Sequence, residues 1–178
     1  MNVEVMRFNQ LNTSEQQVFN SYKSSSFDFN SRIRAGETPD EVIILDALIG
    51  KYECNIPMTL YRAVPLRVYH GLKAGDNYQD FSYLSCSIDK VSVYKFCTEN
   101  AMAILVIDCP IGTHMIDMNI NSQFSNDETE FLLPRNMCCK ITHTNELNND
   151  NEILDYFDGD HWIADGVQRL IEFNLLVE

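Results

Sequence analysis

The order of helix and strand patterns along the chain constrains its fold more than any other feature. Helical patterns fill the first third, up to about residue 56, and strand patterns begin at Met58. The strand-like runs are short and rich in branched and aromatic residues: MTLYRAV, FSYLSCSI, AMAILVID, HMIDM, TEFLLP, CCKITHT and RLIEFNLLV. One helix, DKVSVYKFCTEN, is expected among them. Helices followed by closely spaced strands predict an α+β fold with a mostly antiparallel β core, and disfavour a doubly wound sheet.

The first third contains start and stop patterns for three helices. Ser14 begins a capping-box pattern ahead of apolar residues, and the serines at 24–26 interrupt the helix that follows. A second helix is expected to end at Gly36. The third is expected to have Thr38 as its N-cap, a proline as its first residue and Gly50 as its stop.

The length of the chain predicts one domain. Its 178 residues are 45% hydrophobic, which is enough to bury a sizeable core. We expect a helical segment at about 1–56 and a β core at about 57–178. Within the core, residues 144–166 are acidic and Asn-rich, with no lysine or arginine, and are expected to be a solvated insertion or hairpin. Their aspartates lack the ligand spacing of a calcium loop.

Charge and cysteine content narrow the class of protein. The net charge of −13, from 26 acidic and 13 basic residues, gives no electrostatic footprint for nucleic acid or an anionic membrane. No apolar run is long enough to span a membrane, and the N-terminal residues do not resemble a secretory signal. Six cysteines without a C-x-x-C pair predict free thiols in a reducing cytosol and disfavour a zinc site. We therefore expect a cytoplasmic protein.

Three short stretches place polar side chains inside apolar strands. Arg62 lies in LYRAV, where a half-buried guanidinium needs an anionic partner. Ser85 and Ser87 share one face of YLSCSID, and Glu128 and Glu130 share one face of DETEFLLPRN. Each stretch alone also has an ordinary explanation, as an ion pair, a hydroxyl-rich strand or solvated charges. The glycine-rich phosphate loops, H-E-x-x-H and G-x-S-x-G are all missing from the sequence.

Taken in order, these stretches resemble the arginine-serine-glutamate class of the ADP-ribosyltransferase family, which includes bacterial toxins, phage enzymes and vertebrate ectoenzymes. Further matching features are Phe96, the strand and Pro-x-Gly of ILVIDCPIG, and the Pro-Arg of ETEFLLPR. YKSSSFDFNSRIRAG, with Asn30 and Arg34, is similar to the family's N-terminal helical segment. The match spans about residues 18–143 and implies helices followed by a two-sheet β core.

The resemblance also implies roles for the site residues. Glu130 is expected to bind the ribose 2′-hydroxyl of NAD and to stabilise the cation that forms when nicotinamide leaves. Ser85 is expected to brace Glu130. Glu128 is expected to orient an acceptor guanidinium, and Phe124 to help recognise the protein substrate. The implied NAD-binding residues are Arg62, Ser85, Ser87, Phe96, Asn30 and Arg34; Arg62 contacts the phosphates and Phe96 packs near the nicotinamide.

Three positions depart from the family pattern. Cys86 stands where the serine motif usually has threonine, on the opposite face from Ser85 and Ser87. No second phosphate-binding arginine follows Phe96, so either Lys95 replaces it or the affinity for NAD is low. Ala63 stands where some toxins have another arginine.

The sequence therefore predicts a mono-ADP-ribosyltransferase that uses NAD as substrate, without a metal, and modifies an arginine of a target protein. Its size suits a phage enzyme or an effector delivered into a host cell. Three further functions stay open: an NAD glycohydrolase, a transferase acting on nucleic acid, and a catalytically inactive module that only binds a partner.

Overall fold

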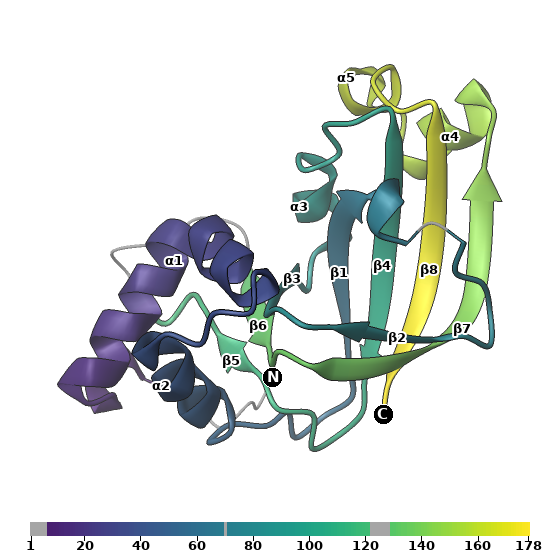
Figure 1. The fold of residues 1–178 in the computed structure, drawn as a ribbon. Coiled ribbons are helices and arrows are strands. Elements are labelled where there is room, and N and C mark those ends of the chain that lie inside the picture. Colours follow the sequence, from purple (N-terminus) through teal and green to yellow (C-terminus); the bar gives the residue numbers. More distant parts are fainter. Residues whose placement is uncertain (1–6, 70, 122–128) are drawn as a thin grey trace.

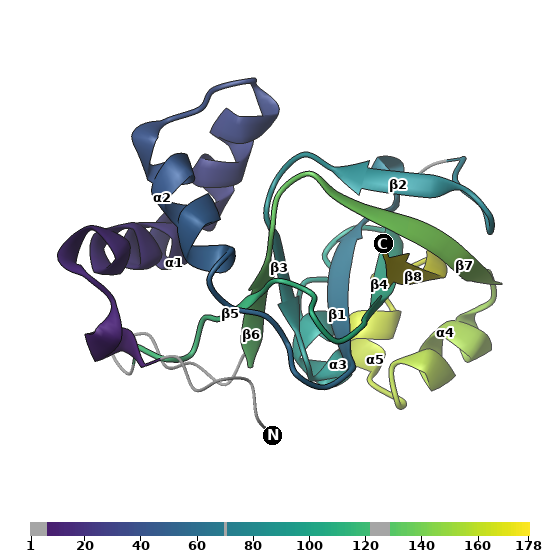
Figure 2. The same ribbon diagram turned by 90° about the horizontal axis from the view of Figure 1, so that it is seen from below.

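A computed structural model describes residues 7–69, 71–121 and 129–178. Its α-helices are α1 (Thr13–Arg34), α2 (Asp40–Ile49), α3 (Lys90–Tyr94), α4 (Asp150–Tyr156) and α5 (His161–Ala164), with short 3-10 turns at Phe8–Gln10 and Leu66–Val68. Its strands are β1 (Met58–Pro65), β2 (Asn77–Asp80), β3 (Leu84–Ser87), β4 (Ala101–Cys109), β5 (Ile116–Asp117), β6 (Glu130–Leu133), β7 (Met137–Leu147) and β8 (Arg169–Val177). Helices α1 and α2 lie on one side, beside β5 and β6, while α3 lies beside β1, and α4 and α5 lie near one end of β4 and β8 (Figures 1 and 2).

The strands form one sheet instead of the two that the resemblance implied. Its order among the described residues is β2-β7-β8-β4-β1-β3-β6-β5, and only the β4–β8 pair is parallel. The strand pairing is shortest between β1 and β3, where the described register contains the single residue pair Tyr61 and Ser87. In contrast, β1 pairs with β4 along its whole length. This thin connection keeps two parts of the core in a single hydrogen-bonded sheet. The α+β class and the mostly antiparallel pairing are confirmed.

Three apolar clusters hold the elements together. The largest consists of side chains that project from the strands of the sheet. It joins side chains of β1, β4 and β8, such as Leu60, to side chains of β3 and β6, such as Phe131. A second packs α1 and α2 against β5 and β6, and a third packs α3, α4 and α5 against β4 and β8. Strand β4 is buried on both faces, since Met102 and Ile104 join the third cluster while Leu105 joins the first. The strand alternation therefore connects two separate cores.

Helix α1 begins and bends differently from the prediction. Its N-cap is Asn12, whose side chain accepts a hydrogen bond from the Glu15 backbone while the Glu15 side chain accepts one from Asn12 N. The capping box is therefore two residues before the expected one at Ser14. The serine run interrupts the helix as expected, but only as a kink at Ser25 (φ −145°, ψ 40°), and α1 continues to Arg34. The two predicted helices thus form one bent element.

Helix α2 has Pro39 at its N-cap and Asp40 as its first residue, so the prediction of Thr38 as the cap was wrong. No side chain caps this end. Asp40 and Glu41 in the first turn place negative charge at the positive end of the helix dipole instead. The helix ends at Gly50, as predicted.

All seven predicted strand runs form strands, and β8 has the predicted bounds. The predictions missed β2, because its sequence NYQD is polar; this strand lies at one edge of the sheet, where it pairs with β7. The predicted helix at 89–100 is shorter and covers only Lys90–Tyr94.

The acidic segment 144–166 is a packed part of the fold and not simply a solvated insertion. It contains the end of β7, α4 and α5. Ile153 and Phe157 are buried against Tyr94 and Leu170, while the charged side chains stay outside. A charge count could not reveal this, because a few apolar residues at helical spacing decide the packing. None of the described helices is long and apolar enough to cross a membrane.

Candidate active site

A pocket of about 250 Å³ lies between α1, β1, β3, β6 and the α3 region. Its lining contains every predicted site residue that the structure describes: Asn30, Arg34, Arg62, Ser85, Ser87, Phe96 and Glu130. Glu128 and Phe124 lie outside the described residues. Residues from five separate parts of the chain thus meet at one cavity.

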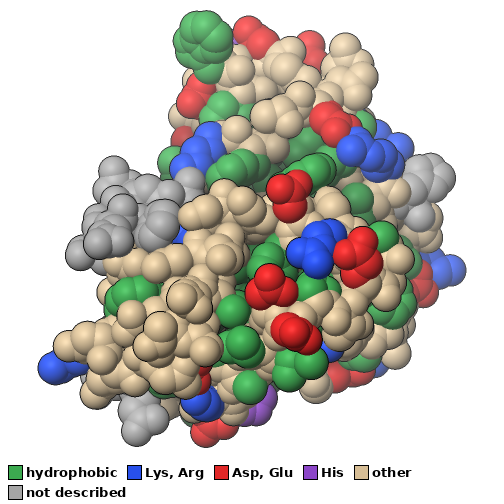
Figure 3. Space-filling model, turned by 60° about the vertical axis from the view of Figure 1, so that its left-hand side comes forward, with side chains coloured by type: hydrophobic (Ala, Val, Ile, Leu, Met, Phe, Trp, Pro, Cys, Tyr) green, Lys and Arg blue, Asp and Glu red, His purple; other side chains and the backbone are tan. Residues whose placement is uncertain are grey.

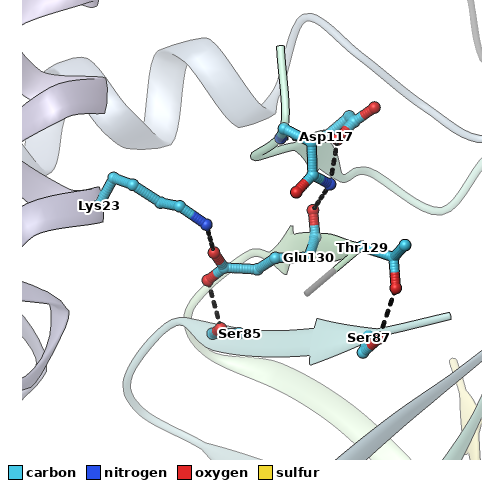
Figure 4. Close-up of polar contacts among 7 residues, drawn as sticks. Lys23, Ser85, Ser87, Asp117, Thr129 and Glu130 are labelled. Atoms are coloured by element: carbon cyan, nitrogen blue, oxygen red, sulfur yellow. Dashed lines mark hydrogen bonds and ion pairs between the residues drawn. The ribbon is translucent and has the colours of Figure 1, made fainter. Parts of the chain in front are cut away.

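Glu130 is the buried carboxylate of this pocket, with 8% of the residue exposed. It begins β6 and lies opposite Ser87 in the β3–β6 pair. Its side chain reaches diagonally along β3, where Oε1 accepts a hydrogen bond from Ser85 Oγ. Its other oxygen, Oε2, accepts one from Lys23 Nζ on α1 (Figure 4). Both carboxylate oxygens therefore have a donor from the protein.

Lys23 is a residue that the sequence reasoning missed. Its side chain is 5% exposed and forms an ion pair with Glu130. Phe27, Asn30 and Arg34 follow a 3-4 spacing, which places them along one helical face. Lys23 lies four residues earlier, across the interruption at Ser25, so helical spacing alone did not connect it to them. Phe27 also lines the pocket, and it too was missed.

Arg62 contributes a cation that no described carboxylate neutralises. Its Nη1 donates to the backbone oxygen of Ser85 at 2.6 Å, and its buried Nε has no hydrogen-bond partner. Arg34 donates from Nη2 to Ser82 Oγ at 2.7 Å. Neither arginine forms an ion pair within residues 7–69, 71–121 and 129–178. The anionic partner expected for Arg62 is thus missing from the described protein, and the pocket suits an anionic ligand.

Asn30 ties α1 to the chain just before β3. Its amide donates to Tyr22 Oη (3.1 Å) and to the backbone oxygen of Tyr83 (3.3 Å), and it accepts from Tyr83 N (3.1 Å). Burial raises the pKa of the Tyr22 phenol, so this hydroxyl stays protonated. Most of the hydrogen-bonding capacity of Asn30 is therefore used within the protein, in shaping the pocket wall.

The backbone before Glu130 is strained. Thr129 has φ of +44°, a conformation that β-branched residues rarely adopt and that costs about 1–3 kcal/mol. The oxygens Thr129 Oγ1 and Ser87 Oγ lie 2.8 Å apart in a hydrogen bond, and Asn119 Nδ2 donates to Glu130 O at 3.1 Å. These contacts hold the start of β6, and with it the Glu130 side chain, in place.

Two exposed aromatic side chains lie at the rim of the pocket. Phe27 is 80% exposed and Phe96 is 51% exposed. Lys95, the expected substitute for a second phosphate-binding arginine, is not among the residues that line the pocket; its Nζ lies 5.2 Å from the centre of the Phe96 ring. Arg34 supplies the second cation instead.

Cys86 lies between Ser85 and Ser87 in β3, and its side chain packs into the largest apolar cluster. Burial raises the pKa of its thiol to about 12, so it is not a nucleophile at neutral pH. Among the described residues, no group of three or more His, Cys, Asp or Glu side chains could hold a metal ion.

The buried ion pair predicts an effect on stability. Glu130→Ala leaves the Lys23 ammonium buried without its carboxylate, and we expect it to lower the free energy of unfolding by about 3–5 kcal/mol. Adding Lys23→Met removes the unpaired charge and should recover much of this loss. Urea denaturation of the single and double variants measures both effects; additive losses would contradict the prediction.

Comparison with solved structures identifies the fold. Plx2a, an ADP-ribosyltransferase toxin from Paenibacillus larvae, superposes with a TM-score of 0.72 at 15% identity, over 96% of this chain and 88% of that chain. C3stau2 from S. aureus, solved with NAD, gives 0.71 at 15% identity, over 95% and 88%. The ADP-ribosylating toxin BECa of C. perfringens, solved with NADH, gives 0.74 at 12% identity; it covers 96% of this chain, which spans about half of that one (45%). No protein-family model matches the sequence, and the curated proteins contain no significant match. The chain therefore has the fold of the bacterial ADP-ribosyltransferase toxins.

Proposed function

We propose that this protein is a mono-ADP-ribosyltransferase that transfers ADP-ribose from NAD to an arginine side chain of a target protein and releases nicotinamide. The observation that carries the proposal is the charge arrangement of the pocket. Two guanidinium groups that have no carboxylate partner among the described residues line the same cavity as one buried carboxylate, in a chain with a net charge of −13. The fold shared with ADP-ribosyltransferase toxins supports it.

In this proposal the two arginines bind the diphosphate of NAD. Guanidinium groups form strong charge-assisted hydrogen bonds with phosphate oxygens, and Arg62 has a buried Nε–H without a partner. Phe96 packs near the nicotinamide. Asn30 and Ser87 shape the wall, because the Asn30 amide and the Ser87 hydroxyl already bond to the protein. The sequence suggested a low affinity for NAD, because no second arginine follows Phe96. In this proposal Arg34 provides the second phosphate-binding guanidinium.

Glu130 provides the electrostatic part of catalysis. Breaking the bond between nicotinamide and ribose develops positive charge on the sugar, and a fixed carboxylate stabilises such a transition state. Ser85 holds this carboxylate through its Oε1. Released nicotinamide leaves the anomeric carbon open to attack by the acceptor nitrogen, which loses a proton as the new bond forms.

The acceptor is proposed from the Glu-x-Glu pattern. Glu128 orients and deprotonates the incoming guanidinium, and Phe124 contributes to recognition of the target.

The state of the cysteines supports a cellular compartment for this activity. All six cysteines are free, which favours action in a reducing cytosol, including that of a host cell.

The proposal is tested with labelled NAD and a cell lysate. We expect the wild-type protein to consume NAD and to label proteins, and mass spectrometry of the products to find ADP-ribose on arginine. Glu130→Gln is the better inactive control than Glu130→Ala, because glutamine keeps an oxygen that can accept the Lys23 hydrogen bond. Absence of both NAD consumption and labelling by the folded wild type would overturn the proposal.

Glu128→Gln distinguishes transfer from simple hydrolysis of NAD. If Glu128 acts only on the acceptor, this variant should lose protein labelling while retaining NAD cleavage, since Glu130 and the arginines are intact. The two activities are measured in parallel, by protein label and by nicotinamide release. Equal labelling by variant and wild type would rule out this role, and wild-type cleavage without any labelling would favour an NAD glycohydrolase.

Transfer to nucleic acid and a purely binding role have less support. On the face in Figure 3, basic side chains are scattered among acidic ones and form no continuous basic patch, unlike a nucleic-acid-binding surface. An inactive binding module has no need to leave the buried Nε–H of Arg62 without a partner among the described residues, which is costly unless a ligand compensates it. NAD turnover by the wild type would exclude such a module.

A further inference from the structure

We propose that Lys23 is a positioning residue for Glu130: together with Ser85, it fixes the orientation of the carboxylate that faces the ribose. This inference rests on the proposed transferase function. It concerns a residue on α1 that lies about two helical turns before Asn30, outside the positions that the family pattern emphasises.

The geometry of the carboxylate provides the first argument. The terminal torsion of a glutamate side chain is broad, so a single hydrogen bond leaves the carboxylate plane free to turn. Here two donors from different elements hold the two oxygens, Ser85 Oγ from β3 on Oε1 and Lys23 Nζ from α1 on Oε2 (Figure 4). Donors on opposite sides of the group restrict this rotation, which is what a preorganised catalytic carboxylate requires.

The remaining acceptor capacity shows that Lys23 does not block the site. An ionised carboxylate has about four lone-pair positions, and the two donors occupy only two of them. A ribose hydroxyl can therefore bind Glu130 while Lys23 stays in place. If Lys23 were instead an inhibitory latch that NAD must displace, its removal would speed the reaction.

Burial argues against a role in stability alone. Taking both charges of a pair out of water costs much of what their attraction gains, so buried pairs are poor stabilisers. The Lys23 side chain is 5% exposed, whereas Lys51, another lysine that bonds a buried glutamate (Glu15), has a side chain that is 53% exposed. Lys51 is therefore a matched control: it also pairs with a glutamate, and its pair lies outside the pocket.

Lys23 lies on the same helix as two residues that line the pocket. The same helix contains Asn30 and Arg34, and Lys23 lies just before the kink at Ser25. One element therefore contributes both a proposed phosphate-binding arginine and the lysine that holds the carboxylate. Packing of α1 against the sheet sets both at once.

The test compares Lys23→Met, Lys23→Arg and Lys51→Met in steady-state NAD cleavage. We expect Lys23→Met to lower kcat by roughly 10²-fold, as a small misplacement of a catalytic group does, with the KM for NAD nearly unchanged. Lys23→Arg keeps the cation and should recover most of the loss, and Lys51→Met should behave as wild type. If Lys23→Met does not fold, Lys23→Gln, which still donates a hydrogen bond, should show a smaller loss of the same kind.

A double-mutant cycle with Glu130→Gln separates positioning from a general structural role. If Lys23 acts through Glu130, Lys23→Met causes no further loss of kcat once Glu130 is replaced. Equal losses in both backgrounds, an unchanged kcat in Lys23→Met, or an increased kcat would each overturn the inference while leaving the transferase proposal intact. A wild type without NAD turnover would overturn both.

Discussion

Replacing Glu130 with glutamine should lower kcat for NAD cleavage by roughly 10²–10³-fold, because it removes the charge that faces the developing ribose cation. The change is nearly isosteric: the amide oxygen can accept from Lys23 Nζ, and the amide NH2 can donate to Ser85 Oγ, whose hydroxyl also accepts. Binding of NAD should change little, since the arginines that we assign to the diphosphate are untouched. Steady-state kinetics and equilibrium titration with NAD measure the two quantities separately.

Glu15→Gln is the matched control for this experiment. Glu15 also has a side chain that is 10% exposed and also pairs with a lysine, Lys51, but it lies outside the pocket. Glutamine at this position preserves the capping box with Asn12. Glu15→Gln should therefore retain full activity. A Glu130→Gln variant as active as this control would show that the buried carboxylate is not the catalytic group.

Replacing Arg62 with methionine should weaken NAD binding by roughly 10–100-fold. A hydrogen bond to a charged group contributes about 1.5–3 kcal/mol, and each 1.4 kcal/mol is a factor of ten in Kd. Arg62 has no carboxylate partner among the described residues, so the loss should appear in ligand affinity and not mainly in stability. The wild-type affinity should also fall with salt more steeply than that of the variant, because one ionic contact is missing. Isothermal titration at two salt concentrations tests both statements.

Arg135→Met is the control that contrasts with Arg62. The Arg135 guanidinium is already neutralised by Asp46, with Nη2 and Nε donating to Oδ2 at 2.7 and 2.9 Å. Its replacement should lower stability and leave the affinity for NAD unchanged. If Arg62→Met binds NAD as tightly as Arg135→Met does, the assignment of Arg62 to the phosphates fails.

Strand positions were predicted best where local pattern and tertiary context agree. The branched and aromatic run at 169–177 forms β8 with the predicted bounds, because it is a partly buried interior strand between β4 and β7. The polar run NYQD was missed, because β2 forms only through edge pairing with β7. Such pairing uses backbone hydrogen bonds, so it does not require a branched or aromatic pattern in the strand's own sequence.

Helix starts show the same limit. Asn12 with Glu15 and Ser14 with Gln17 have the same capping-box spacing, and local sequence alone cannot rank them. In the structure Glu15 also bonds Lys51, which follows α2, and this contact favours the earlier start. The earlier of two equivalent local patterns is thus the one whose glutamate also forms a tertiary ion pair.

The sequence by itself determined most of the order of helices and strands, except β2, α4 and α5, because strand alternation is a local property. Through the family resemblance it also indicated the pocket residues Asn30, Arg34, Arg62, Ser85, Ser87, Phe96 and Glu130, but not Lys23 or Phe27. Only the tertiary structure decided how the charges of that set are paired. Glu130 bonds Lys23, a residue 107 positions away, while Arg62 and Arg34 form no ion pair within the described chain. These pairings depend on how α1 packs against β5 and β6, and such long-range packing is not readable from residue spacing along the chain.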